Sequence, residues 1–258
     1  MTVHTSPRVA PATAVPTGHP VVAWIRRHPV GAFLAWFFTV GQVFAFTPVV
    51  LRAVGFDVLP QPFVVGSTLV GLLLPALVIT RITDGPDAVR AFWRRTWRGP
   101  TQLRWYALAV VAVPAVTTAL ALAFFGAPEA STATIAAAFV QGFVVQGFLV
   151  LVTNNLWEDA AWTGFVQARL QQRHGAWRAA VITGPLFALQ HVALVFSQPP
   201  VVAVIAMTVF MVIAIPFRAL QGWAYNATGS LLVVGLIHAT GNARRGPIRT
   251  RNAWYRNE

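Results

Sequence analysis

Side chains that could do acid–base chemistry are rare in the apolar part of this sequence. Between residues 130 and 257 the acidic residues are Glu158 and Asp159 alone. After residue 28 the histidines are His174, His191 and His238, and the first of these lies in a polar segment. An ionisable group inside a membrane segment is costly and is therefore a functional candidate. The two carboxylates and the last two histidines are such candidates.

The spacing around these histidines places a second side chain on the same helical face. Phe187 precedes His191 by four residues, and His238 precedes Asn242 by four. Residues four apart are neighbours on a helix surface. The two adjacent carboxylates instead point in directions about 100° apart. We expect one of them to face a central cavity and the other to hydrogen-bond a neighbouring helix.

Together these side chains are the components of water activation. A buried carboxylate and a histidine can share a water molecule and take its proton. A second histidine and an amide can stabilise the oxyanion that forms on an attacked carbonyl. Each group alone has a plainer interpretation, as a charged helix end or as a histidine that packs and hydrogen-bonds. Their combination in three separate apolar segments favours hydrolysis.

The composition indicates a membrane protein. Of the 258 residues, 56% are hydrophobic and 10% charged, with a mean hydropathy of +0.62, whereas soluble proteins carry about 25% charged residues. All 19 basic residues are arginine and, with 7 acidic residues, they give a net charge of +12. So few charges in so apolar a chain argue against nucleic-acid binding. Without cysteine the chain has no disulfide, thiolate metal site or cysteine nucleophile.

We therefore predict an all-α fold, a polytopic transmembrane bundle of about six to eight membrane helices around a polar intramembrane cavity. A membrane helix needs roughly 20 apolar residues. Runs of this kind occupy residues 30–51, 62–80, 105–126, 132–168, 177–197 and 200–221. A further run, 231–243, is only about 20 Å long as a helix. We expect it to be a partial or re-entrant helix packed inside protein.

The arginines orient the predicted helices. Basic segments lie near residues 26–27, 81–104, 169–178 and 244–256, and such segments are cytoplasmic by the positive-inside rule. Six spans leave both termini inside, whereas a full crossing by 231–243 would put the C-terminal tail outside. The predicted parts are a disordered cytoplasmic tail (1–29), N-terminal transmembrane helices (30–126), a transmembrane core (127–243) and a basic tail (244–258).

The three polar groups, taken in order, resemble the CPBP intramembrane proteases, also called the Abi or CAAX-protease-and-bacteriocin-processing family, which includes the type II CAAX prenyl endopeptidases. The family pattern is Glu-Glu-x-x-x-Arg, then Phe-x-x-x-His, then His-x-x-x-Asn. The matching segments here are Glu158-Asp159-x-x-x-Thr163, Phe187-x-x-x-His191 and His238-x-x-x-Asn242. The resemblance covers roughly residues 130–243.

The resemblance implies a role for each matching residue in a catalytic core. Glu158 and His191 would activate the water, and His238 and Asn242 would form the oxyanion site. Phe187 would pack beside them.

The sequence departs from the family pattern at two positions. Asp159 is one methylene shorter than the second Glu, and Thr163 stands where the family has Arg. That arginine would be expected to steady the carboxylates. Arg169 lies too far along the helix to replace it simply, whereas Arg218 is a candidate to reach in from another span.

The leading hypothesis is an intramembrane endopeptidase for a membrane-embedded or membrane-associated peptide or protein. We expect no cofactor, no nucleic-acid partner and no metal, since no His-Glu-x-x-His motif occurs. Arginine-only, alanine-rich usage is typical of a GC-rich bacterial genome and favours the bacterial cytoplasmic membrane. One alternative, motivated by Thr163, is a catalytically impaired scaffold or immunity protein in the membrane. A second is a proton-coupled transporter with Glu158 and the histidines as a relay.

Overall fold

The computed structural model describes residues 19–126, 131–142 and 147–242. In these ranges the regular structure is helical and contains no strand, which confirms the all-α prediction. The basic tail predicted at 244–258 lies outside the described residues, as do residues 1–18. Residues 20–27, which the sequence assigned to a disordered tail, form helix α1 (Pro20–Arg27) instead. Proline suits the first turn of a helix, and the Arg26 side chain ties α1 to the Ile82 carbonyl at 3.3 Å.

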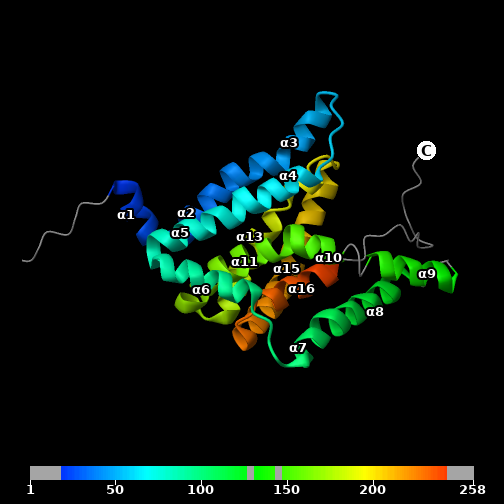
Figure 1. Ribbon diagram of the computed structural model, residues 1–258. Helices are drawn as coiled ribbons and strands as arrows, with labels where there is room; N and C mark the ends of the chain where they lie inside the picture. The colour runs from blue at the N-terminus through cyan, green and yellow to red at the C-terminus, as the bar shows by residue number, and fades with distance from the viewer. Residues whose placement is uncertain (1–18, 127–130, 143–146, 243–258) are drawn as a thin grey trace, which may run out of the picture.

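After α1, the N-terminal half consists of three long apolar helices and a short polar one (Figure 1). Several of the long helices contain a π-helical turn, which is labelled η. The first comprises α2 (Pro29–Trp36), η1 (Phe37–Gly41) and α3 (Gln42–Ala53). The second comprises α4 (Gln61–Gly66), η2 (Ser67–Leu73) and α5 (Leu74–Asp84). After α6 (Pro86–Trp97), the third comprises α7 (Leu103–Ala107), η3 (Leu108–Ala112) and α8 (Val113–Phe125).

The C-terminal half carries the predicted core. It begins with α9 (Thr132–Phe139) and continues through α10 (Gly147–Val150), η5 (Leu151–Asn155), α11 (Leu156–Ala161), η6 (Trp162–Gln167) and α12 (Ala168–His174). It ends with α13 (Ala176–Leu189), α14 (Val192–Val195), α15 (Pro200–Thr228) and α16 (Leu231–Asn242). The two carboxylates lie on α11, which has a π-helical turn on each side. Such turns change which way the following side chains face and occur often at functional sites.

The predicted membrane helices are present with changed boundaries. Within the described residues, five helices are long and apolar enough to span a membrane: Pro29–Ala53, Gln61–Asp84, Leu103–Phe124, Val140–His174 and Pro200–Thr228. Two apolar helices are shorter, Ala176–Leu189 and Leu231–Asn242. The predicted span 177–197 is not one helix, because α13 stops at Leu189. The span predicted to end at residue 221 continues to Thr228.

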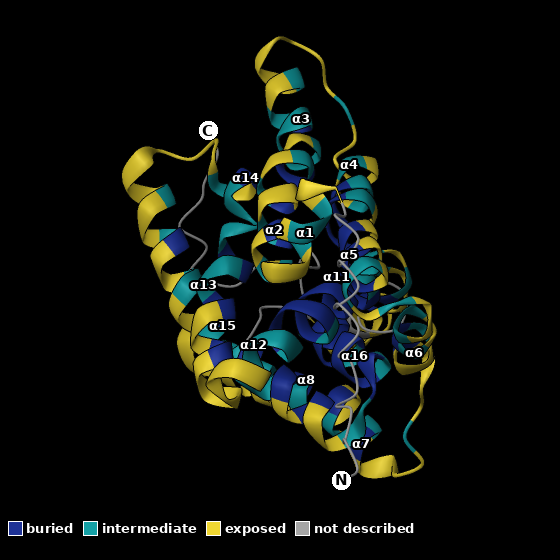
Figure 2. Cartoon of the chain, turned by 90° about the vertical axis from the view of Figure 1, so that its left-hand side faces the viewer, coloured by how far each residue is buried: buried dark blue, intermediate teal, exposed yellow. Residues whose placement is uncertain are grey.

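The polar residues of the core are buried behind a shell of apolar helices. Figure 2 shows α11 and α16 as the most buried helices and much of α3 and α15 as exposed. The exposed residues of α15 include Val204, Val209 and Val212, as expected of a surface that faces lipid. The short helix α16 is buried along most of its length, which agrees with the prediction that it packs inside protein.

Close helix packing holds the shell together. The backbones of α13 and α15 approach at Gly184, where a Cβ atom would lie 2.9 Å from the Ile215 Cα. Small residues allow such approach between membrane helices. The α13–α15 pair thereby forms one wall of the core.

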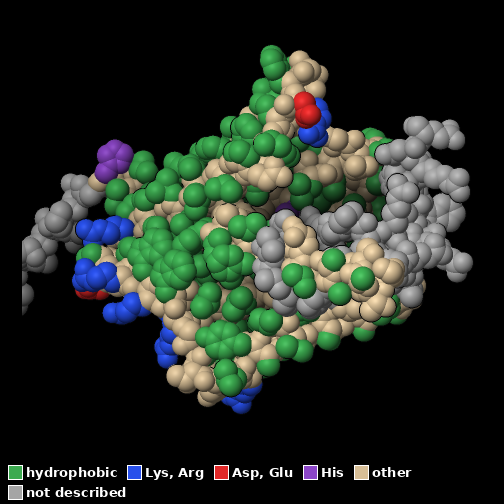
Figure 3. Space-filling view, turned by 45° about the vertical axis from the view of Figure 1, so that its right-hand side comes forward, with side chains coloured by type: hydrophobic (Ala, Val, Ile, Leu, Met, Phe, Trp, Pro, Cys, Tyr) green, Lys and Arg blue, Asp and Glu red, His purple; other side chains and the backbone are tan. Residues whose placement is uncertain are grey.

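The described arginine-rich segments, 26–27, 81–104 and 169–178, lie at one end of the molecule, which we call the arginine-rich end. Most of the arginine side chains visible in Figure 3 lie along that side. Arg169 pairs there with Asp84, and Asn226 donates to Gln171 at 2.7 Å. The Ser230 hydroxyl donates to the Arg98 carbonyl, so α16 starts at this same end and runs inward. Predicted basic segments 26–27, 81–104 and 169–178 are thus on one side of the bundle. That this side is cytoplasmic stays a prediction.

Candidate active site

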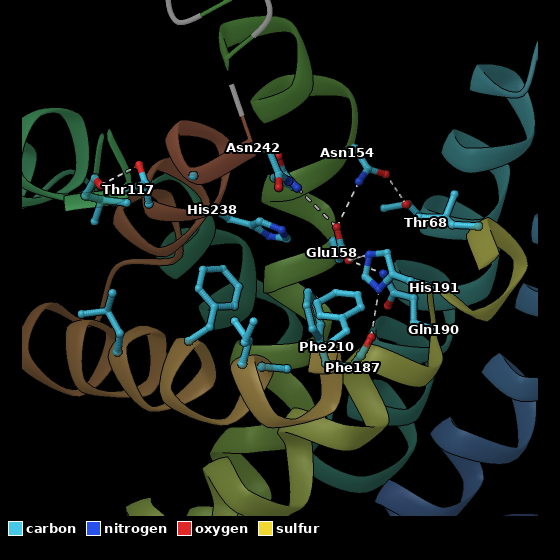
Figure 4. A pocket seen from close by; sticks show the side chains of 18 of the residues that line it. Thr68, Thr117, Asn154, Glu158, Phe187, Gln190, His191, Phe210, His238 and Asn242 are labelled. Atoms are coloured by element: carbon cyan, nitrogen blue, oxygen red, sulfur yellow. Dashed lines mark hydrogen bonds and ion pairs between the residues drawn. The ribbon is translucent and has the colours of Figure 1, made fainter. Parts of the chain in front are cut away.

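A cavity of about 750 Å³ lies where the core helices converge. All four residues predicted to be catalytic line it: Glu158, His191, His238 and Asn242. They come from α11, from the end of α13 and from α16 (Figure 4). The structure therefore brings three sequence-distant motifs to one space, as the sequence predicts.

Neutral amides surround the Glu158 carboxylate, which is 1% exposed. Asn154 and Asn155, one turn earlier on the same helix, donate to Oε2 at 3.0 and 3.4 Å. Gln190, the residue that follows α13, donates to Oε1. Asn154 in turn accepts from the Thr68 hydroxyl of η2. Amide N–H groups match the acceptor oxygens of a carboxylate and orient it without cancelling its charge.

His191 faces Glu158 from the break between α13 and α14. The His191 Nε2 lies 3.8 Å from the Glu158 Oε1, and its Nδ1 lies 3.0 Å from the Phe187 carbonyl oxygen. In a continuous helix that carbonyl would accept from the backbone N–H of His191. The backbone N–H bonds Ala188 instead, at 2.9 Å. The His191 imidazole thus replaces the His191 backbone N–H as the partner of the Phe187 carbonyl. This replacement explains why the helix ends here, which the apolar pattern did not predict.

The ring nitrogens of His191 have different roles as a result. A carbonyl oxygen can only accept, so the neighbouring Nδ1 carries the proton. In the neutral ring Nε2 then presents a lone pair toward Glu158. A carboxylate oxygen and an imidazole nitrogen 3.8 Å apart are both acceptors, and one water molecule has two protons to give them.

Asp159 has surroundings of the opposite kind. Its Oδ1 accepts from Arg218 at 3.0 Å and from Gln221 at 2.8 Å, both of α15. Its Oδ2 lies 3.0 Å from the Nδ1 of His238. Asp159 and Arg218 are both fully buried, so the countercharge is required to offset the loss of hydration. As predicted, the two carboxylates point in different directions, one to the cavity and one to a neighbouring helix.

The guanidinium of Arg218 also reaches Thr163, which stands where the resemblance leads us to expect arginine. Its Nη2 donates to the Thr163 hydroxyl at 2.8 Å and to the Gln167 Oε1 at 2.9 Å. Gln167 is held in turn by the Arg218 carbonyl at 2.9 Å. Arg169 instead pairs with Asp84 at the arginine-rich end. Of the two arginines considered from sequence, Arg218 is therefore the one at the site.

Phe187 packs between the two histidines, in keeping with its predicted role. Its ring centroid lies 5.1 Å from that of His191 and 5.7 Å from that of His238. The Arg218 guanidinium carbon lies 5.3 Å from its centroid. In Figure 4 the Glu158 side chain lies between His238 and His191, with Asn242 on the His238 side.

Several polar residues of the site have no counterpart in the motifs used for prediction. Gln190 also accepts from the Trp162 indole N–H, which fixes the amide that donates to Glu158. Thr68 comes from the N-terminal half of the chain. The remaining residues of this group are Asn154, Asn155, Gln167 and Gln221.

The donors present give little support for a metal ion. In the part of the chain that the structure describes, no group of three or more His, Cys, Asp or Glu residues is arranged to hold one. The oxygens of Asp159 already accept from Arg218 and Gln221 and face the Nδ1 of His238. That the site works without metal stays a prediction.

One protein family matches the segment of the chain that carries this site. Residues 140–244 match a protein-family model described as type II CAAX prenyl endopeptidase Rce1-like. No curated protein and no solved structure matched the chain. The match and the apolar helices identify an integral membrane protein. The segment that carries both carboxylates and both cavity histidines is therefore similar to a CAAX protease-like family.

Proposed function

We propose that this protein is an intramembrane endopeptidase in which Glu158 and His191 activate a water molecule. The observation that carries the proposal is the 3.8 Å separation of the Glu158 Oε1 and the His191 Nε2 at the wall of the cavity. A water between them donates one O–H to each acceptor. Its oxygen lone pairs then point away from both, toward a substrate carbonyl.

The chemistry follows from these positions. Glu158 takes one proton as the water oxygen bonds to the peptide carbonyl carbon, and the carbonyl oxygen becomes an oxyanion. Asn242 donates to that oxyanion from its amide. Collapse of the tetrahedral intermediate breaks the C–N bond. Glu158 returns its proton to the leaving nitrogen, which leaves a new carboxyl terminus and a new amine.

His238 supports the oxyanion in one protonation state. Its Nδ1 faces the carboxylate of Asp159, which can only accept, so Nδ1 carries a proton. The opposite nitrogen, Nε2, donates to the oxyanion when the ring is the doubly protonated imidazolium. The Oδ2 of Asp159 accepts the hydrogen bond from Nδ1 and so keeps Nε2 directed away from Asp159.

The lining of the cavity suits an apolar substrate segment. Much of its lining away from the carboxylate is hydrophobic and comes from η3, α8 and α15, including Val113, Val116, Phe210 and Phe217. A membrane-embedded or membrane-associated peptide presents side chains of this kind. We place the protein in a bacterial cytoplasmic membrane, with lipid as its surroundings and no nucleic acid as partner.

The alternative of an impaired scaffold was motivated by Thr163, which stands in place of an arginine. The contacts of Arg218 weaken that motive, because a guanidinium still bonds the second carboxylate. No observation specifically favours the transporter alternative.

The test is peptide cleavage by the purified protein in lipid vesicles, with quenched fluorescent peptides of transmembrane composition and a farnesylated CAAX peptide as probes. Glu158→Gln should lower kcat by about 10³-fold and His191→Ala by about 10²-fold, within the usual range for general acid–base groups. Asp84→Asn, at the arginine-rich end, is the matched control and should cleave as the parent does. Unchanged cleavage by the first two variants would refute the mechanism.

A further inference from the structure

Arg218 is buried against a row of polar groups that belong to a single helix face. Asp159, Thr163 and Gln167 are spaced four residues apart along α11 and η6, and each bonds one of the two terminal nitrogens of this guanidinium. Arg218 itself lies on α15, on the buried face that includes Ala214, four residues away. The Arg218 guanidinium therefore extends from α15 to α11 and η6 and lies beside Thr163.

The two oxygens of Asp159 are divided between different partners. Oδ1 accepts from Arg218 and Gln221, which leaves Oδ2 for the Nδ1 of His238. The terminal torsion of an aspartate is broad and roughly two-fold, so an unanchored carboxylate can exchange its oxygens or turn away. Arg218 removes that freedom by holding one oxygen in place.

We infer that Arg218 is the positioning residue of the site. It supplies from α15 the cation that position 163 lacks, and through Asp159 it fixes the ring of His238 with Nε2 toward the cavity. The catalytic consequence rests on the proposed function, whereas the orientation of His238 does not. Arg218 is not among the residues that line the cavity, and its effect on His238 passes through Asp159.

A purely structural role would demand only that the buried charge of Asp159 be balanced. The observed contacts include more than this charge balance, because the planar Arg218 guanidinium bonds the Asp159 carboxylate, Thr163 and Gln167 at once. Lysine keeps the charge but cannot bridge in this way. The two roles therefore predict different behaviour for Arg218→Lys.

The experiment compares Arg218→Thr, Arg218→Lys and the exchange Arg218→Thr/Thr163→Arg, which conserves the composition of the site. Arg169→Gln is the control, because Arg169 also joins an aspartate to threonine hydroxyls, but at the arginine-rich end. Each variant in lipid vesicles is assayed for kcat and KM on the peptide probes, for thermal unfolding, and by ¹⁵N NMR of labelled histidine. The NMR signals report which ring nitrogen of His238 is protonated.

In the parent, His238 should show a protonated Nδ1. Arg218→Lys should remain folded, lose about 10- to 100-fold in kcat with KM little changed, and show mixed His238 ring states, as for loss of a residue that orients a reacting group. The exchange should recover kcat to within about tenfold of the parent and restore the parent NMR signal. Arg169→Gln should leave kcat and the signal unchanged.

Parent-like kcat and NMR in Arg218→Lys would overturn the inference. So would an exchange variant that regains thermal stability without regaining the His238 signal. If Arg218→Thr does not fold, the lysine and exchange variants still decide the question. If the parent cleaves none of the probes yet the NMR results hold, the proposed function fails and the positioning role stands.

Discussion

Two carboxylates that are neighbours in the chain have opposite surroundings. Glu158 is held by three neutral amides and faces a cavity and a histidine. Asp159 is held by a guanidinium, an amide and a histidine and is fully buried. Amides orient a charge and leave it available, whereas a guanidinium cancels it. The first carboxylate is thus arranged for reaction and the second for holding other groups in place.

The helix itself produces this division. Glu158 shares a face with Asn154, and Asp159 shares a different face with Thr163, because adjacent helical positions differ by about 100°. The first face meets η2 and α13, and the second meets α15 and α16. One short helix can therefore supply both a reacting group and a structural anchor.

The largest effect on stability is expected for Asp159→Asn. It leaves the Arg218 guanidinium buried without its countercharge, which costs about 3–5 kcal/mol for a buried ion pair. This loss of stability is measured by thermal unfolding, with the intrinsic fluorescence of the 10 tryptophans as the signal. Glu158→Gln should cost less, about 1–3 kcal/mol for a mismatched buried hydrogen bond. Equal melting temperatures for the two variants would contradict the division of roles.

A smaller effect is expected on the Glu158 side from Gln190→Met. Methionine has a similar length but donates no hydrogen bond to Glu158 and accepts none from Trp162. We expect kcat to fall by about tenfold, with a modest change in stability, as for other residues that orient a reacting group. Gln171→Met, which removes an amide acceptor for Asn226 at the arginine-rich end, is the control. If Gln190→Met has the kcat of the parent, the Gln190 amide is dispensable for orienting Glu158.

The smallest effect is expected from metal removal. Because the donors around the two carboxylates are amides and a guanidinium, treatment with a chelator should leave kcat within about twofold. Cleavage measured before and after dialysis against the chelator, and after zinc is added back, checks this. Loss of cleavage on dialysis and its recovery with zinc would show that Glu158 and the histidines bind a metal instead.

The sequence predicts the fold class and the main site residues because both depend on local patterns. Apolar runs predict the spans, and a carboxylate or histidine in such a run is conspicuous. Helix ends are harder to predict: α13 ends where the His191 side chain takes the Phe187 carbonyl, a contact that hydropathy does not report. Residues 20–27 form a helix although their composition suggested a tail.

The uncharged residues around Glu158 could not be predicted, because Asn154, Asn155 and Gln190 have polar amides of a kind also found in loops. Their importance depends on how α13 and η2 pack against α11. Arg218 is the intermediate case. A lone cation in a long apolar helix is a signal in the sequence, but its partner is defined only by the packing of α15 on α11 and η6.

The most direct test of the central claim is turnover by Glu158→Gln, with the melting temperature measured on the same preparation. We expect kcat to fall by about 10³-fold while the protein unfolds in a single transition within a few degrees of the parent. Folding retained with activity lost would separate the reacting carboxylate from its structural neighbour. Parent-like turnover by this folded variant would contradict the account.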